Sequence, residues 1–506
     1  MLDATQNPLT LGIVGTGLMG RGIAQIAAQG GINVLLHDAR AEAAYEARTS
    51  LTNTFARLVE KNKMRSEDAE NYIARIGIAE QIEQMAHCHI IIEAIVENLD
   101  VKRALFQRLE NIVPDTCLLA TNTSSLSVTA IAAGCRLPGR IGGFHFFSPV
   151  PLMKIVEVID GIMSEKWVGD TLTQLATRMG HTPVRAKDTP GFIVNHAGRG
   201  FGTEALRVLG EGIADIGTID SILRQTAGFR MGPFELLDLT GLDVSHPVME
   251  SIYDQYYQEP RFRPSPITRQ RLTAGLLGRK SGRGFYTYHD GKAEPLVPPA
   301  VPEQVDVPVW LSQQNTDAAP RVRTLLRALG ATIEESATPS DKAICIVLPV
   351  GEDTTTAALK ENLNPARTLA LDPLFLDGHR TLMRTPLTTP AARDAAWALF
   401  AADNTPVSVI NDSPGFIVQR VVATIVNIGC DIAQQGIASP ADIDRAVTLG
   451  LGYPKGPLAM GDALGAATVL TILDALYTFY RDPRYRPSPW LTRRARLGIS
   501  LLTPEN

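Results

Sequence analysis

A long internal repeat constrains this chain more than any other feature of its sequence. The segment DTPGFIV, which starts at Asp188, recurs as DSPGFIV, which starts at Asp412. RFRPSP likewise recurs as RYRPSP. The offset from Asp188 to Asp412 also relates Asp220 to Asp444, Pro233 to Pro457, Asp238 to Asp462, and Tyr253 to Tyr477. Because a repeated segment folds as a repeated unit, we expect two copies of one helical domain.

Composition narrows the class of protein. The 506 residues are 45% hydrophobic, which allows several domains with large cores. The formal net charge is −5 with no basic stripe, so we expect no nucleic-acid partner. The 5 cysteines lie far apart without C-x-x-C spacing, which favours free thiols and no metal site. No signal peptide and no apolar run of roughly 20 residues is present, so we expect a cytoplasmic protein without a membrane partner.

A glycine-rich loop near the N-terminus indicates a nucleotide site. Residues 11–14 are typical of a buried strand, and an Ala- and Ile-rich helix follows the loop. Such a loop needs its first glycine for a tight turn, its second for close approach to a pyrophosphate, and its third for helix–strand packing. The helix N-terminus then supplies N–H groups for the phosphates. The loop residues expected to bind the cofactor are Gly15, Gly17, Leu18, Met19 and Gly20.

Asp38 ends the next predicted strand, beyond the helix that follows Gly20. A carboxylate there can accept hydrogen bonds from ribose hydroxyls and would repel a 2′-phosphate, so it favours NAD over NADP. Arg40 lies close by and argues mildly the other way. The alternative is a glycine-rich turn followed by an unrelated aspartate.

Further strand–turn–helix units follow, which predicts a Rossmann-type, doubly wound parallel sheet. Ligands bind at the carboxyl ends of the strands of such sheets. Glu97, Lys102, Asn122 and Ser124 all fall at such ends. Ser124 and Ser125 also suit the N-cap of the next helix, and for Ser125 we favour that role.

The stretch GFHFFSPVP contains the candidate base, His145. Two predicted strands joined by a short turn place His145 near Glu157, with one of the two residues in each strand. A carboxylate that holds one imidazole nitrogen as N–H leaves the other nitrogen to take a proton. From the residue alone, a histidine among phenylalanines is more often structural.

Several motifs together resemble those of the 3-hydroxyacyl-CoA dehydrogenase family, over roughly residues 9–288. The glycine loop, EAIVEN, TNTSSL, HFFSPVPLMKIVE and DTPGFIVN occur in the family's order and spacing. The resemblance implies NAD-dependent oxidation of an L-3-hydroxyacyl-CoA, with acyl-CoA as the small-molecule partner. It also implies that the helical domain forms a homodimer interface.

The resemblance also implies roles for individual residues. His145 would be the catalytic base and Glu157 its partner. Ser124 would contact the substrate hydroxyl, and Asn195 would help to position it. The remaining roles fall on the cofactor: Asp38 on the ribose, and Glu97 and Lys102 near the nicotinamide end.

Two positions depart from the family pattern, and a third bears on the substrate. Ser148 stands where the family usually has asparagine, which puts its role toward substrate in doubt, and His196 stands where it usually has arginine. Tandem members resembling this chain act on 3-hydroxyadipyl-CoA or 3-hydroxybutyryl-CoA, in fatty acid β-oxidation or phenylacetate catabolism. Arg199 lies one helical turn after Asn195, so it is a candidate to meet a distal carboxylate; an ordinary ion pair is the alternative.

The predicted architecture is an α/β domain, an all-α domain, a degenerate α/β segment and a second all-α domain. The expected bounds are 1–187 for the NAD domain, 188–290 for the first helical domain, 291–320 for a proline-rich linker, 321–405 for the degenerate segment and 406–506 for the second helical domain.

The second copy lacks the chemistry of the first. Gln419 replaces Asn195, and at the repeat offset His145 and Glu157 fall on Leu369 and Thr381. We therefore expect one NAD site per chain. The second copy is interpreted as a built-in partner, an intramolecular pseudo-dimer, with a homodimer or a decayed duplication as alternatives. Two alternative functions stay open: that of another Rossmann-fold hydroxyacid dehydrogenase, and NAD binding without turnover.

Overall fold

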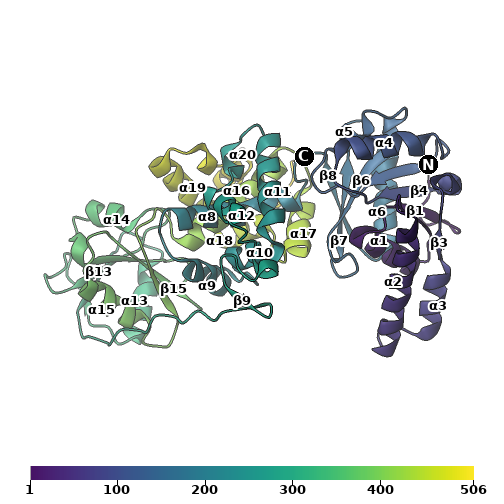
Figure 1. The fold of residues 1–506 in the computed structure, drawn as a ribbon. Helices are drawn as coiled ribbons and strands as arrows, with labels where there is room; N and C mark the ends of the chain where they lie inside the picture. The colour runs from purple at the N-terminus through teal and green to yellow at the C-terminus, as the bar shows by residue number, and fades with distance from the viewer. Residues whose placement is uncertain (1, 506) are drawn as a thin grey trace. The chain divides into compact units, whose positions relative to one another are not determined.

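The computed structural model describes residues 2–505, which form two compact units. Unit 1 comprises the residues up to His196 together with Gln435–Leu451. Unit 2 comprises Ala197–Gln434 together with the residues from Gly452 onward. The yellow-green helix α17 (Pro440–Leu451) in Figure 1 therefore belongs, despite its place late in the chain, with the purple and blue N-terminal elements.

Unit 1 is built on an eight-stranded sheet with the order β3-β2-β1-β4-β5-β6-β7-β8. All neighbouring strands are parallel except β6 and β7, which are antiparallel. The strands are β1 (Thr10–Val14), β2 (Asn33–His37), β3 (Ile76–Ile78), β4 (Ile90–Glu93), β5 (Leu118–Thr121), β6 (Ile141–Phe146), β7 (Ile155–Asp160) and β8 (Thr182–Lys187). This sheet confirms the expected doubly wound α/β domain.

Helices cover both faces of this sheet and bury two separate cores. One core joins the sheet to α1, α2 and α6, and the other joins it to α4 and α5. The central strands β1, β4 and β5 are therefore rich in Leu, Ile and Val, as parallel strands buried on both faces require. The helices are α1 (Leu18–Gln29), α2 (Ala41–Glu60), α3 (Ser66–Ala74), α4 (Leu99–Glu110), α5 (Val128–Ala132), α6 (Lys166–Arg178) and α7 (Val194–Ala197), with 3-10 turns η1 (Ile82–His87) and η2 (Pro138–Arg140).

Unit 2 contains a smaller, six-stranded sheet with the order β12-β11-β13-β14-β15-β16, the green elements in Figure 1. Its last three strands repeat the arrangement of β6-β7-β8, an antiparallel pair followed by a parallel one. The strands are β11 (Val309–Leu311), β12 (Ile333–Glu334), β13 (Ile344–Val347), β14 (Thr368–Leu371), β15 (Arg380–Arg384) and β16 (Val407–Ile410); a separate hairpin pairs β9 (Tyr288–His289) with β10 (Lys292–Ala293). The expected degenerate α/β segment is confirmed.

The helices of unit 2 come from both sequence copies. Those of the first copy are α8 (Arg199–Gly210), α9 (Ile216–Ala227), α10 (Pro233–Thr240), α11 (Leu242–Gln255) and α12 (Pro266–Thr273), with η3 (Pro260–Phe262) and η4 (Arg279–Ser281). Those of the second are α16 (Ile417–Gln434), α18 (Pro457–Leu464), α19 (Ala466–Tyr480) and α20 (Pro489–Leu497), with η6 (Pro483–Tyr485). The small sheet carries α13 (Ala319–Ala328), α14 (Thr354–Lys360), α15 (Pro390–Phe400) and η5 (Pro365–Arg367).

The two copies contact each other reciprocally. In unit 2, α8 packs on α16, its own sequence equivalent, and η3 packs on η6. The N–H of Asn411 donates to the carbonyl of Ile213 in unit 2, and the N–H of Lys187 donates to that of Ile437 in unit 1, both at 2.9 Å. The repeat offset relates Lys187 to Asn411 and Ile213 to Ile437, so the two bonds are equivalent. Matching contacts of this kind define a two-fold, isologous interface.

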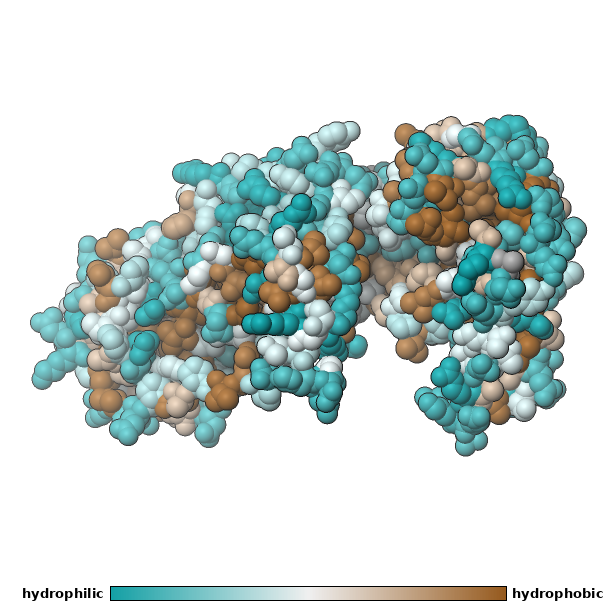
Figure 2. Space-filling model, in the orientation of Figure 1, coloured by the Kyte–Doolittle hydropathy of each residue, from teal (hydrophilic) through white to brown (hydrophobic). Residues whose placement is uncertain are grey.

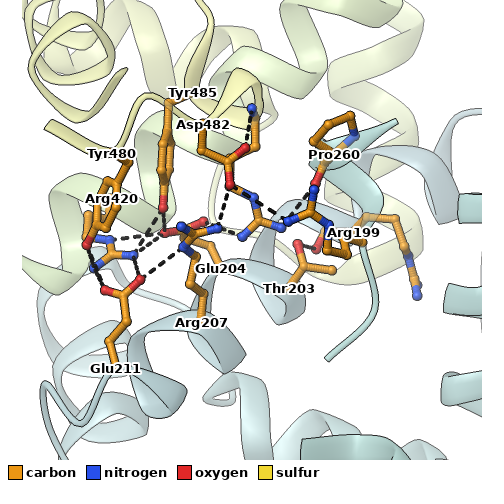
Figure 3. A network of polar contacts seen from close by, with 12 residues as sticks. Arg199, Thr203, Glu204, Arg207, Glu211, Pro260, Arg420, Tyr480, Asp482 and Tyr485 are labelled. Carbon is orange, nitrogen blue, oxygen red and sulfur yellow. Dashed lines mark hydrogen bonds and ion pairs between the residues drawn. The ribbon is translucent and has the colours of Figure 1, made fainter. Parts of the chain in front are cut away.

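One buried ion-pair network crosses between the copies in unit 2 (Figure 3). Arg420 is fully buried and donates to Glu204 Oε1 at 2.8 and 3.0 Å and to Glu211 Oε2 at 2.8 Å. The hydroxyl of Tyr485 also donates to Glu204 Oε1, at 2.8 Å. Burial opposes the guanidinium charge, but Tyr485, Glu204, Tyr480 and Glu211 outweigh it and hold the pKa of Arg420 well above its usual value.

The residues that form this network are not repeated on the other side of the two-fold. At the repeat offset, His196 stands in the place of Arg420 and Ile428 in the place of Glu204. The family usually has arginine where the first copy has His196, and the second copy has arginine there, Arg420. The two halves of the interface have diverged.

The face of the molecule seen in Figure 2 is mainly hydrophilic with apolar patches. Among the described residues, no single helix has the length and apolar character needed to cross a membrane. The pair α18 and α19, bent by 96°, meets that test only when taken together. Within residues 2–505, no cluster of three His, Cys, Asp or Glu side chains suits a metal ion.

We expect Glu204→Ala to lower the melting temperature by several degrees. The substitution removes the main partner of a buried arginine, and breaking a buried ion pair costs about 3–5 kcal/mol. Differential scanning fluorimetry would measure the shift. Glu46→Ala is the matched control, because the Arg40–Glu46 pair is exposed and such pairs contribute little. Equal melting temperatures for the two variants would contradict this account of the network.

Candidate active site

The glycine loop between β1 and α1 has the geometry of a phosphate-binding turn. Gly15 has φ of +97°, and a Cβ there would lie 2.5 Å from the Ala94 carbonyl oxygen. A Cβ on Gly20 would overlap the Gly15 carbonyl oxygen. A Cβ on Gly17 would meet nothing within 4 Å, although Gly17 is the N-cap of α1. The loop therefore presents open space and the N–H groups of the first helical turn to a ligand, and exposed Leu18 and half-buried Met19 follow it.

Asp38, just after β2, is tied to this loop. Its carboxylate accepts hydrogen bonds from the N–H and hydroxyl of Thr16, at 2.8 and 2.9 Å, and from the N–H of Arg40 at 3.1 Å. Partial burial tends to raise the pKa of Asp38, but these hydrogen bonds outweigh it and the pKa is lowered. A charged carboxylate therefore stands at the end of β2.

A buried charge network lies after β4 and β5. Lys102 on α4 is 2.5 Å from Glu93 Oε1 and 3.2 Å from Glu97 Oε2. Thr121 donates to the other oxygen of Glu93 at 2.7 Å. Glu93 has no exposed surface and Lys102 almost none, so each charge depends on the other. The sequence pattern singled out Glu97 and Lys102 but not Glu93, which ends a strand of isoleucines.

Glu97 organises the serine-rich turn after β5. Its Oε1 accepts hydrogen bonds from the Thr123 hydroxyl at 2.6 Å and from the N–H groups of Ser124 and Ser125 at 2.9 and 3.0 Å. Burial tends to raise the pKa of Glu97, but Thr123 and Lys102 outweigh it and the pKa is lowered.

The N-cap role favoured for Ser125 is wrong. The helix α5 begins later than expected, at Val128, and its N-cap is Ser127, whose hydroxyl accepts from the N–H of Ala130 at 3.1 Å. Ser125 instead donates its hydroxyl to Glu97 Oε1, at 3.0 Å. In the same turn, the side-chain oxygen of Asn122 accepts from the N–H of Phe146 on β6, at 2.9 Å.

His145 and Glu157 face each other across β6 and β7. They are directly opposite in the antiparallel register, and His145 Nδ1 lies 2.7 Å from Glu157 Oε2. Both side chains are buried. The ring centroids of Phe147 and Phe192 lie 4.5 and 5.7 Å from the imidazole centroid, so aromatic packing limits the movement of His145.

The second oxygen of Glu157 is also held. Oε1 accepts hydrogen bonds from the N–H groups of Ile193 and Val194, each at 2.9 Å. Phe192, just before them, adopts a left-handed φ of 48°, which is uncommon for a bulky residue. Sequence reasoning missed these two donors, because backbone N–H groups leave no trace in residue identity.

The remaining predicted residues lie in different settings. Asn195 follows Val194 on α7 and is half-buried. Ser148 is exposed just beyond β6. Arg199 begins α8 in unit 2, where burial lowers its pKa and the Tyr453 side chain opposes that shift. The rings of Phe201 and Phe229 pack with Tyr453 at 5.7 and 5.0 Å.

The second copy has no histidine–glutamate pair, but one expected equivalence is wrong. Leu369 pairs with Arg384, so it does not correspond to His145. Asp372, whose N–H donates to the carbonyl of Thr381 at 3.0 Å, takes that place opposite Thr381. The chain from Asp372 to Thr381 is shorter than the chain from His145 to Glu157, and this shortening shifts the offset. Burial raises the pKa of Asp372 to about 7, and Gln419 donates to it at 2.9 Å.

Comparison with known families decides the chain's relationship. A family model described as "3-hydroxyacyl-CoA dehydrogenase, NAD binding domain" matches residues 10–189, and the model of the family's C-terminal domain matches residues 191–288 and 415–500. The chain belongs to the 3-hydroxyacyl-CoA dehydrogenase family. Members of this family are NAD-dependent oxidoreductases. The two C-terminal matches begin at the offset that relates Asp188 to Asp412, which confirms the duplication.

Relatives of this dehydrogenase family include one with the same tandem length. The chain is 36% identical over 494 residues to a 3-hydroxyadipyl-CoA dehydrogenase of Escherichia coli, covering 97% of this chain and 98% of the relative. A crystal structure of 3-hydroxybutyryl-CoA dehydrogenase from Escherichia coli covers 97% of this chain and 99% of its own, with a TM-score of 0.84 at 35% identity. A probable 3-hydroxybutyryl-CoA dehydrogenase of Deinococcus radiodurans is 39% identical and matches 55% of this chain over its whole length.

We expect Gly17→Ala to weaken NADH binding about tenfold or more without lowering the melting temperature. The added methyl group would meet no protein atom but would occupy the space through which a pyrophosphate approaches the backbone. Isothermal titration calorimetry would measure the Kd. Gly202→Ala in α8 is the control, since its Cβ is equally free of neighbours and Gly202 belongs to unit 2. Unchanged NADH affinity in Gly17→Ala would contradict the placement of the phosphates.

Proposed function

We propose that the protein oxidises L-3-hydroxyacyl-CoA to 3-oxoacyl-CoA with NAD⁺ as hydride acceptor. The observation that carries this proposal is the buried contact of His145 with Glu157, in the same domain as a glycine loop open at Gly17. The open loop, the N-terminus of α1 and the charged Asp38 fit a dinucleotide with a free ribose hydroxyl pair. When bound, NAD⁺ supplies the acceptor for the hydride from C3 of the substrate.

His145 acts as the general base. Glu157 accepts the Nδ1 hydrogen, so Nε2 takes the proton from the substrate's 3-hydroxyl group as the C3–H bond breaks. The carboxylate then stabilises the imidazolium that forms. Because protonated imidazole cannot accept a proton, oxidation should fail in acid.

Ser124 and Asn195 position the reacting oxygen. Support for Asn195 comes from the second copy, where Gln419 is its equivalent. There Asp372 lies opposite Thr381, as His145 lies opposite Glu157 in the first copy. Gln419 donates a hydrogen bond to Asp372. Ser148 lies just beyond the strand that carries His145 and could take part with its hydroxyl. The cofactor roles of Leu18, Met19, Asp38, Glu97, Lys102 and Asn122 belong to the same proposal.

We propose a short-chain or dicarboxylic substrate, with 3-hydroxyadipyl-CoA as the first candidate. The tandem relative that matches this chain over nearly its whole length is a 3-hydroxyadipyl-CoA dehydrogenase. Arg199, which begins α8 four residues after Asn195 in the chain, is the cation proposed for the distal carboxylate. The reciprocal contacts between copies support an intramolecular pseudo-dimer in place of a homodimer.

We expect His145→Gln to reduce kcat by about 10²–10⁴-fold, the usual contribution of a general base, while NADH still binds. Stopped-flow absorbance of NADH formation would measure turnover. His87→Gln is the control, because His87 lies at the end of η1, away from the catalytic pair. Near-normal kcat in His145→Gln would remove this residue from the mechanism, and NADH binding without any turnover in the unmodified protein would favour a non-catalytic role.

We expect Arg199→Met to lower kcat/KM for 3-hydroxyadipyl-CoA about tenfold or more and that for 3-hydroxybutyryl-CoA about twofold at most. Only the dicarboxylic substrate has a second carboxylate to lose its cation, and a charge-assisted hydrogen bond is worth about 1.5–3 kcal/mol. Steady-state assays over short-chain, long-chain and dicarboxylic substrates would rank the preferences. Arg199→Lys, which keeps the charge, should lose less. Equal losses for both substrates would contradict this role.

A further inference from the structure

The inert second copy supplies a helix to unit 1, the unit that carries the catalytic pair. In that unit α17 packs on β7 and β8, and it buries Ile443, Ala446 and Val447. The backbone bond from Lys187 to Ile437 joins the end of β8 to the segment that precedes this helix. β7 is the strand that carries Glu157.

Gly450, near the end of α17, packs against Val194. A Cβ on Gly450 would lie only 3.0 and 3.1 Å from the two methyl carbons of Val194. A real side chain would therefore displace Val194 by a few tenths of an ångström, or more if it were branched. Glycine is an unfavourable helix residue, so its presence in α17 needs a reason such as this close approach.

Val194 connects this contact to the base. Its N–H is one of the two donors to Glu157 Oε1, at 2.9 Å, and Glu157 Oε2 lies 2.7 Å from His145 Nδ1. Three successive contacts therefore run from the second copy to the imidazole: Gly450 to Val194, Val194 to Glu157, and Glu157 to His145.

The other half of the two-fold provides an internal comparison. There the first copy's α9 packs on α16, and the positions equivalent to Gly450 and Val194 are Thr226 and Val418. The strand equivalent to β7 carries Thr381 in the place of Glu157. The glycine therefore occurs on the side with the glutamate, and a branched side chain stands on the side without it.

We infer that Gly450 is a positioning residue for the catalytic pair. The absence of a side chain at Gly450 lets Val194 keep its N–H on Glu157, and thereby sets the orientation of His145. The second copy thus contributes to turnover without touching substrate or cofactor. This inference rests on the proposed role of His145 as the base.

The test is Gly450→Thr, which installs on the catalytic side the residue found on the inert side. We expect kcat to fall about tenfold, because small displacements of catalytic groups have large effects on rate, while KM and the NADH Kd change about twofold at most. The acid limb of the kcat–pH profile should also move, since Glu157 would hold the imidazole less well. Thr226→Gly is the matched control and should leave kcat, KM and the pH profile unchanged.

A rescue variant separates positioning from general damage. Val194→Ala, added to Gly450→Thr, makes room for the threonine while keeping the backbone N–H, so it should restore much of the lost kcat. Gly450→Ala, a smaller change, should give an intermediate loss and serves if Gly450→Thr does not fold.

Wild-type kcat and pH profile in a folded Gly450 variant would overturn the inference, as would equal losses in Thr226→Gly or a double variant no better than Gly450→Thr. The result for His145→Gln distinguishes a failure of the proposed function from a failure of the positioning role alone. If His145→Gln keeps its turnover, the proposed function fails; if it is inactive while Gly450→Thr is normal, only the positioning role fails.

Discussion

The structure of the candidate site depends on one buried carboxylate, that of Glu157. Its two oxygens face different parts of the domain: one holds His145 on the neighbouring strand, and the other receives the N–H groups of Ile193 and Val194. A buried carboxyl group without such partners would be costly, so both the sheet and the segment after β8 must be in place to satisfy the hydrogen bonds of Glu157. The proposed base therefore takes its orientation from residues far apart in the chain.

The duplication explains how the second copy can lack a reaction site and still matter. Reciprocal backbone bonds show that the copies keep a two-fold relation, but their side chains have diverged. Arg420 and Glu204 form a buried pair on one side, where the other has His196 and Ile428. In an assembly of two identical chains the halves of an interface must stay alike. A tandem chain is free of that restriction, so one half can specialise in support of chemistry.

Much of the site followed from residue types at fixed spacings. Gly15, Gly17 and Gly20 have local backbone reasons for being glycine, and the antiparallel strands around a short turn bring His145 to Glu157. The two predictions that were wrong, for Ser125 and Leu369, have physical causes as well. Ser125 satisfies the N-cap preference, but Glu97 competes for its hydroxyl. A constant repeat offset predicts Leu369 at the position equivalent to His145. The chain before Thr381 is shortened, so Asp372 takes that position.

The sequence by itself determined the family, the nucleotide loop, the duplication and the absence of the histidine–glutamate pair from the second copy, because each depends on side-chain identity at short or regular spacing. Only the tertiary structure decided which groups hold Glu157, that Glu93 pairs with Lys102, and that α17 belongs to unit 1 beside Val194. These features depend on backbone groups and on packing between segments far apart in the chain, and neither is encoded in any local pattern.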